Sequence, residues 1–266
     1  MNALEQLKKY MALDALILII TNAYEIDYRI VGGARAEKNQ FPWQVGIHIV
    51  KNTSYNFCGG ALISHLWVLT AAHCLVECIS ATVISNSTRL YPFLEIYNLS
   101  FLQPGKRYKV VKFISHDAFK RETLDNDVAL LKLEKPVDRY RALLLADNDF
   151  IAPNMYVSVS GWGRVGNKKE HSTDLLYIHM ITISTRECQH FYKSEILDNT
   201  FCSIGEGIDN ICVGDSGGPA IYYRHGHPIH IGVLSFLHSS GCQINRPVGF
   251  TKTCFFRNWI KNISGI

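Results

Sequence analysis

Short apolar or alternating runs, each followed by turn-forming residues, constrain what this chain can fold into. Such runs lie at 45–50, 109–114, 128–133, 156–160 and 229–236. Clusters of Gly, Pro, Asn and Asp separate them, which predicts strands joined by tight connections. Many short strands of this kind indicate an all-β protein built from barrels or sandwiches. The chain has 266 residues, 47% of them hydrophobic, which is ample for a sizeable core.

The clearest helical signal stands at the C-terminus. Phe256, Trp259, Ile260 and Ile263 recur at the spacing of one helix face. We therefore expect a C-terminal helix that packs this apolar face against the body of the protein.

The segment Gly214–Pro219 reads Gly-Asp-Ser-Gly-Gly-Pro. A serine held between glycines can present its hydroxyl and neighbouring backbone N–H groups to one small volume. Acyl transfer needs that combination of an attacking oxygen and donors for the developing oxyanion. Taken alone, the segment fits a glycine-rich turn equally well.

Two further segments supply what a serine nucleophile lacks. His73 follows the apolar run 67–69, and Asp127 stands at the start of the run 128–133. A serine hydroxyl needs a base, and the base needs an acceptor that fixes its tautomer. His73, Asp127 and Ser216 are the three residue types required, so the three segments together favour a catalytic over a structural histidine.

With these motifs the chain resembles the trypsin/chymotrypsin family of serine endopeptidases, from Ile30 to the C-terminus. Supporting matches lie at 57–60, 160–163 and 235–236. Four ordered motifs carry the resemblance: Arg29-Ile30-Val31-Gly32-Gly33, Thr70-Ala71-Ala72-His73-Cys74, Asp125-Asn126-Asp127-Val128-Ala129-Leu130-Leu131 and Gly214-Asp215-Ser216-Gly217-Gly218-Pro219.

The resemblance implies two six-stranded antiparallel β-barrels, joined by a linker at about 141–155, with the active site in the cleft between them. His73 and Asp127 would come from the first barrel and Ser216 from the second. Ser216 would be the nucleophile, His73 the general base and then acid, and Asp127 the residue that orients His73. The N–H groups of Gly214 and Ser216 would form the oxyanion hole. Peptide hydrolysis through an acyl-enzyme requires no metal or cofactor.

The N-terminus reads as a secretory signal peptide, residues 1–23. Lys8 and Lys9 precede the apolar run 15–20, and small residues follow it. A start at Met11 would leave a shorter signal, and a buried amphipathic helix is the alternative. The run is too short for a membrane span, which needs about 20 apolar residues. We therefore expect a secreted, extracellular protein.

The resemblance makes residues 24–29 an activation propeptide ahead of a protease domain at 30–266. A trypsin-like protease would cut after Arg29 and create an α-ammonium group on Ile30. That charge would be buried against the carboxylate of Asp215 and order the oxyanion loop. Until cleavage the chain would be an inactive zymogen.

Eight cysteines in a chain expected to be secreted suggest disulfides. The resemblance implies the pairs Cys58–Cys74, Cys188–Cys202 and Cys212–Cys242. Cys78 and Cys254 remain, either as free thiols or in an intermolecular bridge.

The resemblance also predicts the specificity pocket. Asn210 falls at its base, where trypsin has an aspartate, so cleavage after Arg or Lys is expected to be poor. Leu237 and Val248 fall on walls where trypsin and chymotrypsin have glycines, which narrows the slot as in elastases. Placing Gly249 on the wall instead would reopen a chymotrypsin-like slot. We favour uncharged, small or medium aliphatic residues before the scissile bond.

Neighbouring positions would contact the rest of a protein or peptide substrate. Leu124 and Phe236 would supply an apolar surface for the preceding substrate residues, with Ser235 beside them. Protein protease inhibitors are further candidate partners.

Other features are less specific. The net charge is +4 and the basic residues are scattered, so no nucleic-acid surface is expected. His225, His227 and His230 fit no standard zinc spacing, and Gly226 with Pro228 indicates a surface hairpin. N-glycosylation sequons occur at Asn52, Asn86, Asn98 and Asn262.

Two other functions stay open. A catalytically silent family member could act as a binding or cofactor protein, although the required residues are all present. An esterase without proteolytic activity is the third reading.

Overall fold

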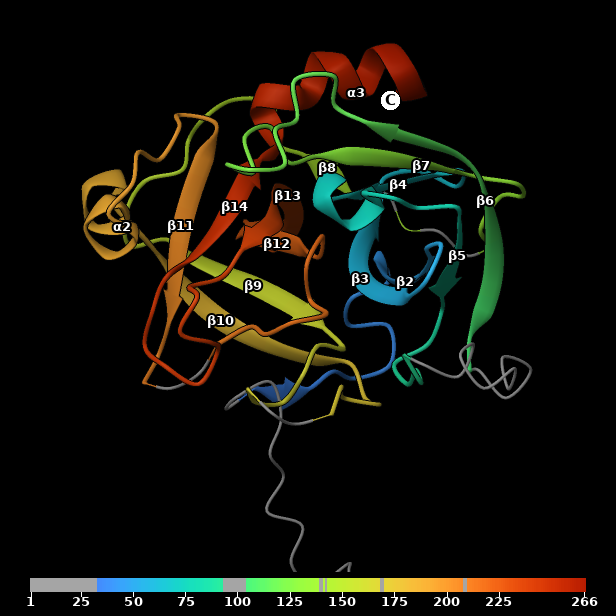
Figure 1. Ribbon diagram of the computed structural model, residues 1–266, viewed down its shortest axis with the longest axis horizontal. Coiled ribbons are helices and arrows are strands. Elements are labelled where there is room, and N and C mark those ends of the chain that lie inside the picture. The colour runs from blue at the N-terminus through green and yellow to red at the C-terminus, as the bar shows by residue number, and fades with distance from the viewer. Residues whose placement is uncertain (1–32, 93–103, 139–140, 142, 168–169, 208–209) are drawn as a thin grey trace, which may run out of the picture.

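The computed structural model describes residues 33–92, 104–138, 141, 143–167, 170–207 and 210–266 (Figure 1). The predicted signal peptide, propeptide, Arg29 and Ile30 lie outside the described residues, as does Asn98. None of the helices within the described ranges is long and apolar enough to cross a membrane.

The first barrel closes on itself in the order β2-β3-β4-β7-β6-β5, and every pairing in it is antiparallel. Its interior is aliphatic, with Val45, Ile47, Leu62, Leu69 and Leu131 all buried. Its strands are β2 (Gln44–Val50), β3 (Tyr55–Leu62), β4 (Trp67–Thr70), β5 (Ser80–Ser85), β6 (Lys106–Ser115) and β7 (Ala129–Leu133).

The second barrel follows the order β10-β11-β14-β13-β12-β9, and the pairing of β9 with β10 closes it. Two short strands extend this sheet: β1 (Ala34–Arg35) pairs with β10, and β8 (Leu144–Leu145) runs parallel to β13. The barrel strands are β9 (Tyr156–Gly161), β10 (Leu176–Ile183), β11 (Thr200–Gly205), β12 (Pro219–Arg224), β13 (His227–Phe236) and β14 (Val248–Lys252).

The predicted fold is confirmed. Strands occupy all of the predicted runs, and the two barrels stand side by side (Figure 1). A 3₁₀ turn, η5 (Thr253–Phe256), leads into the C-terminal helix α3 (Arg257–Ser264). Phe256 and Ile260 of this segment are buried in the core of the first barrel, with Trp259 and Ile263 packed against it. The last helix therefore ties the end of the second barrel to the first.

A second helix, α2 (Thr185–Tyr192), was not predicted. Ser184 caps it by accepting a hydrogen bond from the N–H of Glu187, while the Glu187 carboxylate accepts from the N–H of Ser184. The Ser-x-x-Glu spacing of this capping box is visible in the sequence and could have revealed the helix.

The three implied disulfides are present: Cys58–Cys74, Cys188–Cys202 and Cys212–Cys242. Cys78 and Cys254 are partly buried and form no disulfide within the described part of the chain. They belong to different surroundings, because Cys78 packs on the core of the first barrel and Cys254 on that of the second.

The predicted histidine hairpin is also present. His225 and Gly226 form the turn between β12 and β13, both with positive φ, and Arg224 pairs with His227 across it. His230 lies further along β13 and is fully buried, with Nδ1 2.7 Å from the hydroxyl of Thr253. Of the described sequons, Asn52, Asn86 and Asn262 are exposed.

Candidate active site

His73 and Asp127 form a close pair at the edge of the first barrel. His73 lies on the 3₁₀ helix η2 (Ala72–Leu75), directly after β4, and Asp127 lies just before β7. Nδ1 of His73 donates to Oδ2 of Asp127 at 2.7 Å, and the His73 backbone N–H donates to Oδ1 at 2.8 Å. The carboxylate thus fixes both the imidazole tautomer and the backbone that carries it.

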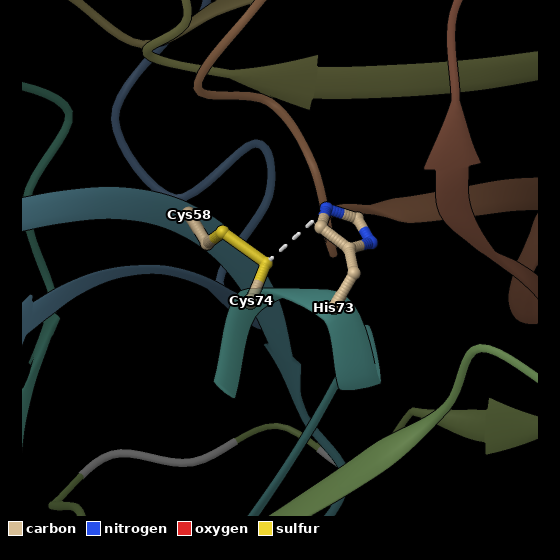
Figure 2. A group of neighbouring side chains, drawn as sticks. All are labelled: Cys58, His73 and Cys74. Atoms are coloured by element: carbon tan, nitrogen blue, oxygen red, sulfur yellow. Dashed lines mark hydrogen bonds between the residues drawn. A yellow bond between two sulfur atoms is a disulfide. The ribbon is translucent and has the colours of Figure 1, made fainter. Parts of the chain in front are cut away.

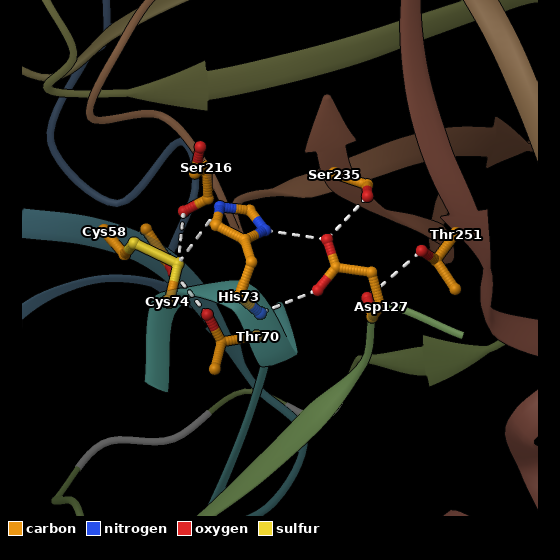
Figure 3. A network of polar contacts seen from close by, with 9 residues as sticks. Cys58, Thr70, His73, Cys74, Asp127, Ser216, Ser235 and Thr251 are labelled. Atoms are coloured by element: carbon orange, nitrogen blue, oxygen red, sulfur yellow. Dashed lines mark hydrogen bonds and ion pairs between the residues drawn. A yellow bond between two sulfur atoms is a disulfide. The ribbon is translucent and has the colours of Figure 1, made fainter. Parts of the chain in front are cut away.

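Asp127 is completely buried, and the second barrel helps to hold it. The hydroxyl of Ser235 on β13 donates to Oδ2 of Asp127 at 2.5 Å, and Thr251 on β14 donates to its backbone oxygen at 3.1 Å (Figure 3). Asn126 precedes it with a φ of 54°, which asparagine tolerates better than most residues. The buried carboxylate therefore accepts three hydrogen bonds, two from His73 and one from Ser235, so both of its oxygens have partners.

The loop that carries Ser216 depends on glycines. Gly214 has a φ of 101° and Gly217 a φ of 80°, which side chains rarely permit. A Cβ on Gly217 would lie 2.6 Å from the carbonyl oxygen of Gly59. The N–H of Gly59, in β3, donates to the carbonyl oxygen of Ser216 at 2.8 Å. The first barrel therefore contacts and holds this loop, which is part of the second barrel.

Two N–H groups of this loop find no acceptor in the part of the chain that the structure describes. The N–H groups of Asp215, Gly217 and Gly218 donate to carbonyl oxygens at 2.8–3.1 Å. Those of Gly214 and Ser216, the expected oxyanion hole, donate to nothing among the described residues. Unused donors beside a serine are what an oxyanion hole requires.

His73 and Ser216 line one cavity of about 440 Å³ between the barrels, together with Leu124, Ser235 and Phe236. The hydroxyl of Ser216 forms no hydrogen bond to His73. Nε2 of His73 instead lies 3.8 Å from the sulfur of Cys74, which is also 3.7 Å from the backbone oxygen of Ser216 (Figure 3). Of the three predicted catalytic side chains, His73 and Asp127 are hydrogen-bonded to each other, and Ser216 lines the same cavity as His73.

Cys58, His73 and Cys74 bring three atoms of metal-binding type within 4.8 Å of one another (Figure 2). The two cysteines are joined as a disulfide, however, so neither offers a thiolate to a metal ion. The cluster instead anchors η2, and with it His73, to β3.

Asp215, the expected partner of the Ile30 ammonium group, is completely buried. Its carboxylate accepts from the N–H of Gly163 at 2.7 Å and of Cys212 at 3.0 Å. Burial raises the pKa of Asp215 to about 6, against the lowering effect of these two bonds. Among the described residues, the two N–H donors therefore do not offset the cost of burying the negative charge of Asp215.

Asn210, the expected base of the specificity pocket, is buried and neutral. Its amide nitrogen donates to the carbonyl oxygens of Ile244 and Arg246, and its oxygen accepts from the N–H of Ile211. Asn210 does not line the cavity that contains Ser216.

The expected wall residues differ in position. Leu237 lines the cavity and packs on the core of the second barrel, whereas Val248 is buried inside that core and does not line the cavity. The Phe236 ring packs against Gly249 where a side chain would otherwise project. A Cβ built on Gly249 would lie less than 3.0 Å from atoms of this ring. A second hollow of about 320 Å³ shares Leu124, Phe236 and Leu237 with the first.

Two contacts of the site were missed in the sequence. Ser235, expected among the substrate-binding residues, lines the cavity and also donates its hydroxyl to Asp127, and Thr251 was not singled out at all. Both come from strands more than 100 residues away from Asp127. No local pattern in the sequence reports such a contact.

Comparisons with known proteins agree with this architecture. The family described as Trypsin matches residues 30–260. A collagenase of Hypoderma lineatum is 30% identical over 97% of this chain and 99% of its own length. A trypsin of Phaedon cochleariae is 33% identical over 87% of this chain and 86% of its own length.

A solved structure of HL collagenase superposes with a TM-score of 0.76 at 30% identity. The match covers 88% of this chain and 98% of the collagenase chain. The likeness therefore extends over both barrels and the cleft between them.

Proposed function

The chain belongs to the trypsin family and is a serine endopeptidase, and from that premise we propose that His73, Asp127 and Ser216 are its catalytic triad. The observation that carries the proposal is the hydrogen bond from Nδ1 of His73 to Asp127, on the wall of the cavity that contains Ser216. This bond leaves Nε2 of His73 as the basic nitrogen that faces the cavity.

In the proposed reaction, the Ser216 hydroxyl turns toward Nε2 of His73 and attacks the carbonyl carbon of the scissile bond. His73 takes the hydroxyl proton and then delivers it to the leaving amine, while Asp127 stabilises the imidazolium. The N–H groups of Gly214 and Ser216 bind the oxyanion. Water, activated by His73, then hydrolyses the acyl-enzyme and restores Ser216.

We further propose that the protein is secreted as a zymogen, with a signal peptide at 1–23, a propeptide at 24–29 and the protease domain at 30–266. The activation step in this proposal is supported by the buried carboxylate of Asp215 and its raised pKa. An α-ammonium group on Ile30 is the cation that cleavage after Arg29 would supply. The pairing would favour the loop arrangement in which Ser216 reaches His73.

The proposed preference is for small or medium aliphatic residues before the scissile bond. The neutral Asn210 offers no counter-charge to Arg or Lys, and its amide is already occupied by backbone groups. Leu237 lines the cavity that contains Ser216, where its side chain takes up room that a larger substrate side chain would need.

A fluorophosphonate probe tests the proposed triad. After trypsin has cut the protein at Arg29, the probe should label Ser216, and the Ser216→Ala variant should remain unlabelled. Turnover should fall by about 10⁴ or more in Ser216→Ala and in His73→Ala, with substrate binding largely retained.

Casein, gelatin and fibrillar collagen form the substrate panel, the last two because of the name of the Hypoderma relative. A cleaved wild-type protein that stays unlabelled and hydrolyses none of them would be a catalytically silent homologue. Labelling with hydrolysis of esters alone would indicate an esterase.

A further inference from the structure

The imidazole of His171 occupies the space beside Gly214 that a side chain would need. A Cβ built on Gly214 would lie 2.6 Å from Nδ1 of His171 and closer still to Cε1, with the Cα of Gly163 3.2 Å away. Carbon atoms do not approach a ring this closely, so the imidazole packs directly against the glycine backbone. Gly214 is thus enclosed by His171 and Gly163.

The His171 ring is itself held by both barrels. Its Nδ1–H donates to the carbonyl oxygen of Trp162, 3.2 Å away, in the second barrel. The ring also meets Phe57 of β3 edge to face, with centroids 6.0 Å apart. Burial lowers the pKa of His171 below its ordinary value, the bond to Trp162 opposes this, and the positive charge of Arg164 adds to the lowering, so the ring is neutral at neutral pH. A neutral, partly buried ring held at two sides is a rigid support.

The segment that carries His171 is fastened beside the oxyanion loop. The N–H of Ser172 donates to the carbonyl oxygen of Gly163 at 3.0 Å, and Arg164 pairs with His171 in an isolated bridge. The N–H of Arg164 donates to the carbonyl oxygen of Val213, the residue before Gly214, at 2.8 Å. His171 therefore contacts Gly214 through its ring, and its bridge partner Arg164 contacts Val213 through the backbone.

We propose that His171 is a positioning residue for the oxyanion hole, whose ring holds the backbone of Gly214 so that its N–H faces the cavity. The inference rests on the proposed role of Gly214 as an oxyanion donor. Glycine is the most flexible residue, so its conformation has to be imposed by neighbours. An oxyanion donor acts only within a narrow range of distances. A small displacement of Gly214 therefore reduces the stabilisation of the transition state more than it reduces the binding of the substrate.

Three variants separate the ring from its hydrogen bond. His171→Ala removes both, His171→Phe keeps a planar ring without the bond to Trp162, and His171→Gln keeps a donor without a ring. The activated enzymes are assayed on an acyl-side peptide with an aminocoumarin leaving group. This substrate has no peptide on the leaving-group side of the scissile bond. A substitution that altered only the binding of leaving-group residues would therefore not change KM.

In His171→Ala, kcat should fall about 10- to 100-fold, below the 10²–10³-fold loss expected when a donor is removed outright. KM should stay within about twofold, and affinity for a peptide boronic acid, whose adduct places an oxygen in the oxyanion hole, should fall in parallel with kcat. His171→Phe should recover most of kcat, and His171→Gln should recover little.

A kcat within twofold of wild type in His171→Ala would overturn the inference, as would a change in KM alone with unaltered boronic acid affinity. If His171→Ala does not fold, the inference is tested by comparing His171→Phe with His171→Gln. Equal kcat values for these two variants would show that the ring does not position Gly214. Ser216→Ala is the reference for the proposed function. Activity of that variant equal to wild type would refute the triad itself, whatever His171 does.

Discussion

The hydroxyl of Ser235 lies 2.5 Å from Oδ2 of Asp127, the same oxygen that accepts from Nδ1 of His73. Ser235 comes from the second barrel and Asp127 from the first, so the orientation of His73 depends on the contact between the barrels. Two of the three donors to the carboxylate remain when this hydroxyl is removed.

Replacing Ser235 with Ala is therefore expected to lower kcat by about tenfold, near the lower limit for a hydrogen bond to a charged group. Thr251→Val is the matched control, because Thr251 donates only to the backbone oxygen of Asp127. It should reduce the free energy of unfolding with a smaller effect on kcat. Equal kcat values for wild type and Ser235→Ala would show that the hydroxyl does not orient the pair.

Activation depends on Arg29 in the proposed scheme. Replacing Arg29 with Gln removes the basic side chain that a trypsin-like protease recognises, so trypsin treatment should leave the variant inactive. N-terminal sequencing of wild type after treatment should begin at Ile30. Full activity of the uncleaved precursor in the fluorogenic assay would refute the zymogen.

The uncleaved chain should carry a pH signature of Asp215. Burial raises the pKa of Asp215 from its ordinary value of 3.8 to about 6. Between these values the folded chain keeps a proton that the unfolded chain loses, so the free energy of unfolding falls as the pH rises through this window. A shift of about 2 units corresponds to roughly 3 kcal/mol.

Asp215→Asn removes this titration and provides the control. Urea unfolding at pH 4, 5, 6 and 7.5, in an inactive Ser216→Ala background, should show the variant gaining relative to the parent up to about pH 6 and then reaching a plateau. After cleavage the parent should lose the effect, because the Ile30 ammonium compensates the carboxylate. A difference independent of pH in the uncleaved chains would contradict the raised pKa.

The apolar runs separated by turn residues predicted an all-β protein, and the resemblance carried by the four motifs implied the two barrels that the structure has. The strands that cover the runs at 45–50 and 229–236 are buried at nearly every position, and an apolar run is a local property of the sequence. Helix α2 was missed although the capping box formed by Ser184 and Glu187 marks its start. The Ser-x-x-Glu spacing is also a local property, so the sequence alone could have predicted this helix.

Contacts between distant strands were beyond local patterns. The bond from Ser235 to Asp127, the packing of His171 against Gly214 and the Phe236 ring over Gly249 each join residues from different elements. Their formation depends on the closure of the barrels, which fixes register and approach across many residues. A motif predicts which side chain acts, but not which neighbour holds it.

Primary specificity can be changed at Leu237 if the proposed slot is correct. The wild-type enzyme, profiled on a peptide library after activation, should cleave after Ala, Val or Leu. Arg and Lys should be poor there, because a buried cation without a counter-charge costs several kcal/mol and Asn210 is neutral. Dominant cleavage after Arg or Lys would overturn this assignment.

Leu237→Ala should widen the cavity that Leu237 lines beside Ser216. The ratio of kcat/KM for Phe over Ala before the scissile bond should then rise about tenfold, the range that a few methylene groups provide in an apolar pocket. Leu144→Ala is the matched control, because Leu144 is exposed on β8 and lines neither hollow. An unchanged ratio in Leu237→Ala would place the wall of the slot elsewhere, with Gly249 the next position to test, since Gly249→Ala would displace the Phe236 ring.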